Sequence, residues 1–330
     1  WGPHGPGRAS WRGRGAASLA PRPAGPARAG FPRARADALA TVVFLSPALV
    51  LIVLFVVWPA VETLRLSFYS EDGFAGLRNF ATLLASRDTL NASRFLRESP
   101  PWGSLIHNAV WVSFHLPLTV VIGIALAVLF QRVSGWWVSV VKLAIFLGIV
   151  TPMVVGGVII RFLFDENAGI TPAVARALGI SSLAHSWTAY PETALVALIA
   201  GSVWLWTGFS MVLHSAGLST IDRELYEAAD LDGASEWVRF WKITLPLLRP
   251  VTEVVVALTF LWELKIFDIV YAATQGGPGG ASMVLALQMY FLAFREQSPF
   301  KAAAVATLLT AISLVIGVWF ARRVRQGATA

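Results

Sequence analysis

The chain has 330 residues, of which 56% are hydrophobic and 14% are charged, and its mean hydropathy is +0.65. A soluble domain carries about 25% charged residues, so this composition excludes an ordinary soluble protein and predicts one that lies in a membrane. The net charge of +7 does not indicate a nucleic-acid partner, because the basic residues lie between apolar segments or in the tails, and the lack of cysteine excludes disulfides and thiolate chemistry.

The N-terminal segment is basic and rich in Gly, Pro, Ala and Arg. Such a composition cannot bury a core, so we expect a disordered tail over residues 1–37 that contacts anionic lipid. A basic region before an apolar run is also typical of a secretory signal. However, the run 38–61 is too long for a signal core and lacks a clear small-residue cleavage site. We therefore expect it to be the first transmembrane helix.

Further apolar runs are long enough to cross the membrane as helices, which takes about 20 residues. We expect these spans at 108–130, 143–160, 193–217, 247–272 and 302–321. The span 143–160 is short and is interrupted by Gly148, Pro152, Gly156 and Gly157. The runs predict an all-α membrane protein with about six transmembrane helices. The apolar run 281–294 is shorter and follows the sequence TQGGPGG, so we expect a surface or re-entrant helix there.

The segment 247–272 is unusual among the expected spans because it contains Glu253, Glu263, Lys265 and Asp268. Each charge at the middle of the bilayer costs about 2.5–3.5 kcal/mol on insertion scales, so these groups must face protein or water. Lys265 and Asp268 are three residues apart, and on a helix they could pair. Glu263 has no such partner in its own turn, so we expect it to face a cavity or another subunit.

The distribution of positive charge predicts the orientation. Six spans place both termini on one side of the membrane. The segments on that side (the N-terminal tail, 131–142, 218–250 and the C-terminal tail) hold seven, two, four and three Lys or Arg, sixteen in all. The opposite loops (about 69–106, 163–193 and 274–301) hold seven. Cytoplasmic loops are enriched in Lys and Arg, so both termini, including the tail 324–330, are expected in the cytoplasm.

The loop 219–246 is a polar island in this apolar chain. Asp222, like the neighbouring Ser219 and Thr220, can cap a helix that opens with Glu224. Gly233 ends or bends that helix. A second helical piece follows, with Trp237, Phe240 and Trp241 on one side, and Pro246 starts the next span. The product is a helix–turn–helix elbow at the membrane face, and from the residues alone it could equally be an amphipathic connector that rests on lipid headgroups.

The spacing of residues in this loop favours a specific function over a connector that only rests on lipid. Glu227-Ala228-Ala229, three residues, Gly233, nine residues and then Ile243-x-Leu245-Pro246 resemble the EAA loop of ATP-binding-cassette importer permeases. Other segments that resemble this family are GLRNF (76–80), WTGFSMVLHSAGL (206–218), KIFDIVYAAT (265–274) and GGP (276–278). The resemblance covers about residues 40–323. It is nearest to the sugar branch, similar to the maltose, glycerol-phosphate and α-glucoside permease subunits.

The resemblance implies a type I importer permease fold for residues 38–323 and a location in the bacterial inner membrane. It also implies that the EAA loop docks into a separate ATPase subunit. There Glu227 makes a polar contact, and the small side chains of Ala228 and Ala229 allow the two surfaces to approach closely. Gly233 permits the sharp elbow because glycine tolerates positive φ. The motif ends with Ile243, Leu245 and Pro246.

The same resemblance implies the partners. The chain contains no Gly-x-x-x-x-Gly-Lys-Ser/Thr run, so ATP and Mg would bind to the ATPase partner, which we expect as a dimer. A second, related permease would complete the pathway, and we favour a heterodimer. An extracytoplasmic substrate-binding protein is expected to dock at Gly276, Gly277 and Pro278.

The substrate pathway is expected near broken helices and intramembrane polar groups. The candidate polar residues are Glu263, Lys265 and Asp268, although a Lys–Asp pair that only sets helix packing is an equal alternative. Trp204 and Trp206 could stack on a sugar ring, but core packing or an interface belt also explains them.

Two other classes of function compete with an importer. An ATP-independent secondary transporter or channel would use Glu263, Lys265 and Asp268 as a polar relay, and such proteins often contain inverted repeats. No convincing repeat relates residues 38–160 to 193–321. A membrane-embedded enzyme needs a metal cluster or a nucleophile with its base. The five histidines lie far apart and never at His-x-x-x-His spacing, so we expect neither a metal site nor a catalytic residue.

Overall fold

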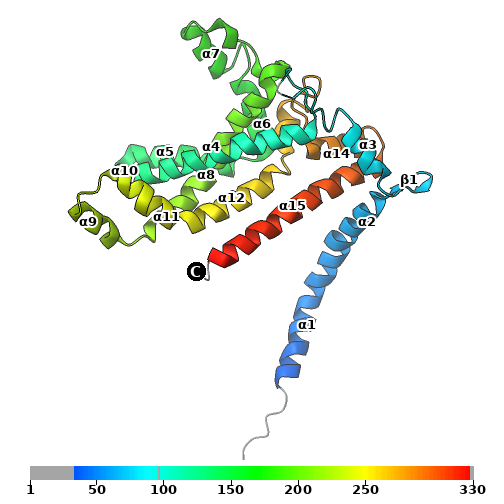
Figure 1. The fold of residues 1–330 in the computed structure, drawn as a ribbon, viewed down its shortest axis with the longest axis horizontal. Coiled ribbons are helices and arrows are strands. Elements are labelled where there is room, and N and C mark those ends of the chain that lie inside the picture. Colours follow the sequence, from blue (N-terminus) through cyan, green and yellow to red (C-terminus); the bar gives the residue numbers. More distant parts are fainter. Residues whose placement is uncertain (1–32, 96, 328–330) are drawn as a thin grey trace, which may run out of the picture. The chain divides into compact units, whose positions relative to one another are not determined.

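The computed structural model describes residues 33–95 and 97–327. Most of the predicted tail, residues 1–32, lies outside the described residues, as do residues 328–330. The chain divides into two units, Trp1–Val57 and Trp58–Ala330, which are considered separately below. The described residues are mainly helical, which confirms the predicted all-α class (Figure 1).

The first unit is a helix. It contains α1 (Arg33–Ile52) and the single π-helical turn η1 (Val53–Val57). The prediction that the tail extends to residue 37 is wrong, because α1 already begins at Arg33. Residues 33–36 alternate Arg and Ala, which are strong helix formers, and contain no Gly or Pro. With the next helix, Thr41–Leu66 is long and apolar enough to cross a membrane.

The second unit opens with α2 (Trp58–Leu66) and a short antiparallel hairpin, β1 (Tyr69–Ser70) and β2 (Gly73–Phe74). In the hairpin Tyr69 pairs with Phe74 and Ser70 pairs with Gly73. Helix α3 (Arg78–Ala85) follows and packs against the last long helix.

Three helices of 29 residues form the frame of the second unit: α4 (Ser104–Arg132), α8 (Pro191–Ser219) and α15 (Pro299–Gly327). At 1.5 Å per residue each is about 44 Å long, more than the roughly 30 Å of hydrocarbon. Helix α8 buries more of its surface than α4 or α15 and packs along α4. These helices give the predicted spans near 108–130, 193–217 and 302–321, each a few residues longer than expected.

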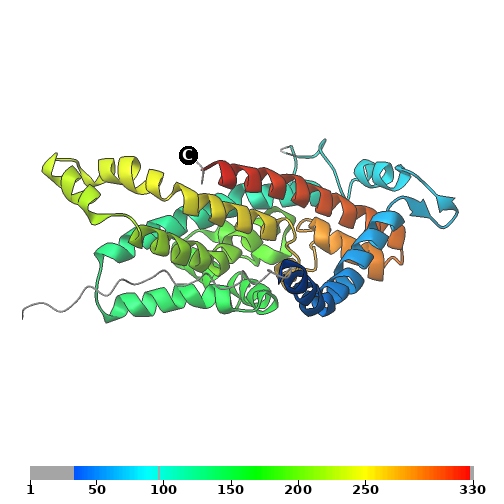
Figure 2. The ribbon, with the colours of Figure 1, turned by 90° about the horizontal axis from the view of Figure 1, so that it is seen from below.

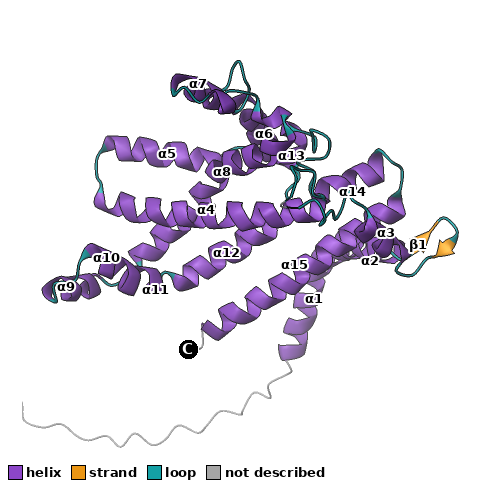
Figure 3. Cartoon of the chain, turned by 45° about the horizontal axis from the view of Figure 1, so that its top comes forward, coloured by secondary structure: helices purple, strands orange, loops and turns teal. Residues whose placement is uncertain are grey.

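The other two expected spans are broken. The predicted span 143–160 consists of α5 (Trp136–Val150) and α6 (Met153–Leu163), which meet at 115°. Pro152 lies at the break, where it cannot donate a helical hydrogen bond. The predicted continuous span 247–272 is wrong. Helix α12 (Arg249–Glu263) ends at Glu263, and a separate short helix, α13 (Asp268–Ala273), follows and packs beside α6 (Figure 3).

The remaining elements lie at the two ends of the long helices. At one end are α9 (Arg223–Leu231), α10 (Glu236–Arg239), the π-helical turn η4 (Phe240–Thr244) and α11 (Leu245–Leu247). At the other end, with the hairpin, is α14 (Leu285–Phe294) (Figure 2). The segment between α6 and α8 forms α7 (Ile170–Ala177) and the 3-10 turns η2 (Ser181–Leu183) and η3 (Trp187–Ala189). With 10 residues, α14 is too short to cross, as predicted for 281–294.

Polar side chains of α4 bond to the backbone where the other helices break. Asn108 Nδ2 donates to the carbonyl of Leu264 (3.3 Å), just after α12, and its Oδ1 accepts from the N–H of Leu285 (2.8 Å), the first residue of α14. His107 Nδ1 lies 2.8 Å from the carbonyl oxygen of Met283. Irregular backbone inside a membrane protein needs such internal partners, because lipid offers none. Helix α4 therefore holds the breaks in place.

Candidate coupling surface and translocation site

The elbow predicted from the EAA motif is present at one end of the bundle. Asp222 caps α9 by accepting from the N–H of Glu224 (3.1 Å), and Ser235 Oγ accepts from the N–H of Val238 (3.4 Å) at the start of α10. Between the two helices Gly233 has φ +71°, and no atom lies within 4 Å of the position where its Cβ would be. The turn therefore requires the backbone freedom of glycine rather than its small size.

The α9 surface is open to a partner. Glu227 and Ala228 are exposed and Ala229 is half-buried. Among the residues that the structure describes, the Glu227 carboxylate has one ion pair, to Nε of Arg223 one turn earlier (3.2 Å). Leu231, at the end of α9, leaves 90% of its surface exposed. Sequence reasoning did not single out Leu231; an apolar residue at the end of a polar helix was the available signal.

Ion pairs join the elbow to the long helices. Arg239 bonds Asp230 of α9 and, at 3.2 Å, Glu236 of its own helix. Glu236 also pairs with Arg132, the last residue of α4. Tyr226 on α9 bonds Thr244 through their hydroxyl groups (3.0 Å). A pocket of about 440 Å³ lies among these residues. These contacts connect the elbow directly to the end of α4, and connect α9 to the residue before α11.

The last three motif residues lie where the elbow joins α12. Ile243 and Leu245 are half-buried and Pro246 is exposed. Leu245 packs near the apolar contact between α4, α8 and α12. These residues fix the elbow to the helix bundle, whereas α9 carries the exposed part of the motif.

Glu263 lies deep in the second unit. Its side chain is 1% exposed, and its Oε1 lies 2.6 Å from Nδ1 of His115 on α4, whose side chain is fully buried. We expected Glu263, which has no partner in its own turn, to face a cavity or another subunit; instead its partner comes from another helix of this chain, 148 residues earlier.

Several polar atoms of this pair and of α4, α8 and α12 are buried and have no hydrogen-bond partner among the described residues. They are the second oxygen of Glu263, Nε2 of His115, Oγ1 of Thr259, and Nε1 of Trp111 and of Trp206. Thr259 lies one turn before Glu263 on α12, and the Trp111 ring stacks on the His115 ring with centroids 5.9 Å apart. Buried polar groups without partners are rare and often mark a functional site. Thr259, Trp111 and His115 were not predicted from the sequence.

Lys265 and Asp268 do not form the predicted pair. The helix ends at Glu263, so Lys265 lies in the turn before α13 and Asp268 begins α13. Both side chains are exposed, and within the described ranges no ion pair joins them. The i,i+3 geometry assumed for them exists only on a continuous helix.

The two predicted tryptophans differ. The Trp206 ring is buried against Trp262, with centroids 4.8 Å apart, in the core between α4, α8 and α13. Trp204 is exposed at the edge of α8, and its Nε1–H donates to the carbonyl of Ala144 on α5 (3.2 Å). Trp206 therefore lies near the buried polar atoms, and Trp204 does not.

At the opposite end the Gly-Gly-Pro loop is held by its own hydrogen bonds. Ser282 Oγ donates to the carbonyl of Gly277 (2.7 Å) and lies 2.7 Å from the Thr274 hydroxyl. Gly276 is buried with φ +80°, and Gly277 and Pro278 are half-buried.

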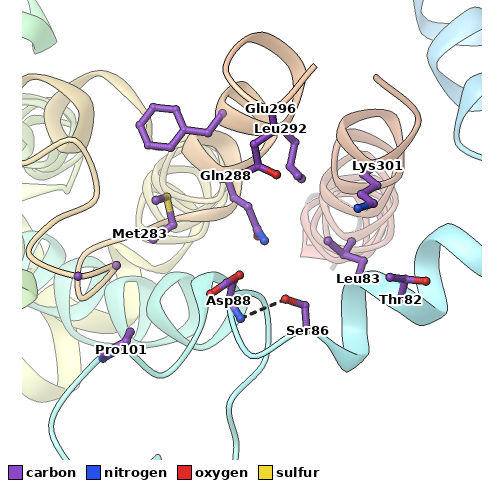
Figure 4. A pocket seen from close by; sticks show the side chains of 13 residues that line it. Thr82, Leu83, Ser86, Asp88, Pro101, Met283, Gln288, Leu292, Glu296 and Lys301 are labelled. Atoms are coloured by element: carbon purple, nitrogen blue, oxygen red, sulfur yellow. Dashed lines mark hydrogen bonds between the residues drawn. The ribbon is translucent and has the colours of Figure 1, made fainter. Parts of the chain in front are cut away.

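A pocket of about 270 Å³ continues from this loop, between α3, α14 and the start of α15 (Figure 4). Asp88, Gln288 and Lys301 point toward it. Gln288 is fixed by Ser104 and by Thr89, whose Oγ1 accepts from its Nε2 (2.8 Å).

Outside the membrane spans, the pKa of the Asp165 carboxyl group is lowered. The N–H groups of Ala168 (3.0 Å) and Asn167 (2.9 Å) donate to Asp165 Oδ1 in the loop after α6, and they lower the pKa of that carboxyl, with a smaller effect from Arg161. Asp165 thus stays ionised and orders the turn that leads to α7.

Comparison with known proteins agrees with this arrangement. Residues 119–326 match the family model described as binding-protein-dependent transport system inner membrane component. A probable ABC transporter permease protein of Pyrococcus horikoshii is 53% identical over 280 residues, which is 85% of this chain and 96% of the relative. The α-glucoside transport system permease protein AglF of Rhizobium meliloti is 32% identical over 285 residues, covering 84% and 80%.

A solved structure has the same fold. It is the crystal structure of a bacterial ABC transporter involved in the import of the acidic polysaccharide alginate, with a TM-score of 0.73 and 19% identity over 89% of this chain and 97% of that one. The likeness confirms the importer permease fold that the motif implied.

Proposed function

The chain belongs to the family of binding-protein-dependent transport system inner membrane components, and we propose that it forms half of the pathway of an ATP-driven importer for an oligosaccharide or α-glucoside-like sugar. It is a multi-pass membrane protein and a transport subunit, not an enzyme. The observation that carries the proposal is the exposed EAA elbow of residues 227–246 at one end of the bundle. The name of the α-glucoside permease relative supports a sugar as the substrate.

The elbow is the proposed contact with the ATPase. ATP and Mg bind to that separate subunit, a dimer, and α9 enters a cleft on its surface. Glu227 makes the polar contact, the small side chains of Ala228 and Ala229 allow close approach, and Leu231 adds an apolar contact. Closure of the ATPase moves α9 as a rigid body. The Arg132–Glu236 and Tyr226–Thr244 contacts then carry the movement into the spans.

The proposed pathway passes the break after α12. Glu263 and Trp206 have buried polar atoms without protein partners, and a sugar offers hydroxyl groups that can both donate and accept. Lys265 and Asp268 are exposed at the same break. Trp204 is also exposed and lies on α8, two residues before Trp206. A second, related permease supplies the other half of the pathway, in a heterodimer.

The two ends of the bundle have different proposed partners. Both termini and the elbow face the cytoplasm, as the excess of Lys and Arg on that side supports. The extracytoplasmic binding protein docks at Gly276, Gly277 and Pro278 and uses the adjacent pocket beside Lys301.

The test is mass spectrometry of the proteins that co-purify with the chain after mild detergent extraction from its native membrane. We expect a nucleotide-binding subunit and a second permease. Glu227→Gln should lose the ATPase subunit, whereas Glu224→Gln, at another exposed site three residues earlier on α9, should keep it. If the chain is recovered alone and moves solute in liposomes without ATP, it is a secondary transporter. Recovery of the ATPase with only copies of this chain would overturn the heterodimer.

A further inference from the structure

A groove of about 610 Å³ lies between α12 and the last turns of α15, near the elbow end of the bundle. Figure 3 shows the two helices side by side. The walls of the groove are apolar and come from Leu245, Val256, Trp319 and Phe320. The candidate span formed by α15 ends at Arg323. The groove thus opens where this span reaches the membrane surface.

Two arginines form the rim of the groove, one from each helix. Oε1 of Glu253 accepts from Nε of Arg249 (3.0 Å) and from Nε of Arg323 (3.4 Å). Glu253 therefore lies between the two guanidinium groups, and its side chain is only 19% exposed. Arg323 also lies over the Trp319 ring, 5.4 Å from its centroid.

This arrangement orients the arginines but leaves most of their donors available. A guanidinium has five N–H groups, and only Nε of each is used here. Among the described residues the terminal nitrogens of Arg249 and Arg323 have no hydrogen-bond partner. Two positive charges and one carboxylate leave the rim with a single net positive charge. The fork of a guanidinium matches the oxygens of a phosphate group.

We propose that the groove binds an anionic phospholipid. The phosphodiester bonds the terminal nitrogens of Arg249 and Arg323, and an acyl chain lies along Val256 and Phe320. The single net charge of the rim complements the single charge of a phosphodiester. Tryptophan and arginine at the end of a span are typical of the headgroup level, and basic pockets between transmembrane helices bind anionic headgroups. An apolar helix of a second permease would fill the groove but would leave these donors unpaired.

The proposal is tested by native mass spectrometry of the full chain purified in detergent and titrated with phosphatidylglycerol or phosphatidylcholine. The wild type should retain phosphatidylglycerol in preference to phosphatidylcholine. In the double variant Arg249→Gln/Arg323→Gln, retention of phosphatidylglycerol should fall about tenfold, equivalent to roughly 1.4 kcal/mol. Arg322→Gln is the matched control, because it removes an exposed charge next to Arg323 that does not line the groove.

A second variant keeps the test decisive if the double variant folds poorly. Val256→Phe fills the apolar part of the groove and leaves the rim charges in place, so it should lower the retention of both lipids. Equal retention by all variants, or no preference between the two lipids in the wild type, overturns the proposal. Crosslinks from Val256 to a second permease in the complete complex would show that a polypeptide occupies the groove instead.

Discussion

Oε1 of Glu263 on α12 lies 2.6 Å from Nδ1 of His115 on α4, with both side chains almost fully buried. A lone carboxyl group at membrane depth is costly, and this contact gives it a partner. It also joins the end of α12 to the middle of α4, about two helical turns along α4 from Asn108, which bonds the carbonyl of Leu264. The pair therefore has a structural role beside any contact with substrate.

Replacing one member of the pair should destabilise the protein more than replacing both. In His115→Leu, Glu263 stays buried without its partner, and the loss should be about 3 kcal/mol. The double variant His115→Leu/Glu263→Leu removes the buried carboxyl group together with its partner, so part of the loss should be recovered. The measurement is the thermal unfolding midpoint of the chain in detergent. A double variant that is no more stable than His115→Leu would contradict the structural role of the pair.

Asn108 should be as important as the buried pair, although it carries no charge. Asn108→Leu removes the partners of the Leu285 N–H and the Leu264 carbonyl, and each buried group left unsatisfied costs about 1–3 kcal/mol. Asn108→Asp keeps an acceptor for Leu285 and should lose less. The control is Asn167→Leu, the same change at an exposed site. If both leucine variants unfold at the same temperature, α4 does not hold the breaks.

Local patterns predicted much of this fold. Apolar runs of about 20 residues identified the long helices, because a helix must satisfy its own backbone in lipid. Pro152 indicated the break between α5 and α6. Asp222 and Gly233 indicated the elbow, since capping and positive φ are properties of single residues. The resemblance then identified which residues of the elbow form a motif.

Contacts between distant residues could not be predicted. His115 and Glu263 are 148 residues apart, and nothing local to either names the other. The carbonyl just after the end of α12 bonds Asn108 of another helix, a contact that the segment 247–272 does not contain. From that segment alone we predicted a continuous span and a Lys265–Asp268 pair that the structure does not show. Polar residues at a helix break are satisfied by tertiary structure, which a single-segment pattern does not contain.

The Arg132–Glu236 ion pair should affect coupling more than stability. Both side chains are at least half exposed, and pairs of this kind contribute about 0–1 kcal/mol. Arg132→Gln and Glu236→Gln should each reduce substrate-stimulated ATP hydrolysis by the complete importer, and the double variant should be no worse than either single one. Arg97→Gln, at the opposite end of the chain's bundle, is the control. Additive losses would mean that the two residues act independently of their contact.

Gly233 gives the sharpest test of the elbow as a coupling device. Gly233→Pro cannot reach φ +71° and removes the N–H that donates to the Asp230 carbonyl (3.1 Å). The variant should insert normally, because Gly233 is exposed and far from the spans, but substrate-stimulated ATP hydrolysis should collapse. Gly233→Val should be intermediate, since positive φ costs an ordinary residue about 1–2 kcal/mol.

Gly233→Asn is the matched control for these variants. Asparagine adopts the left-handed conformation more readily than other side chains, and the space around the Gly233 Cβ position is open, so coupling should stay near the wild-type level. The measurement is ATP hydrolysis by the reconstituted importer with and without substrate. If substrate stimulates ATP hydrolysis by the Gly233→Pro importer as strongly as by the Gly233→Asn importer, the turn between α9 and α10 does not position α9 for the ATPase. The coupling surface would then have to be sought outside the EAA loop.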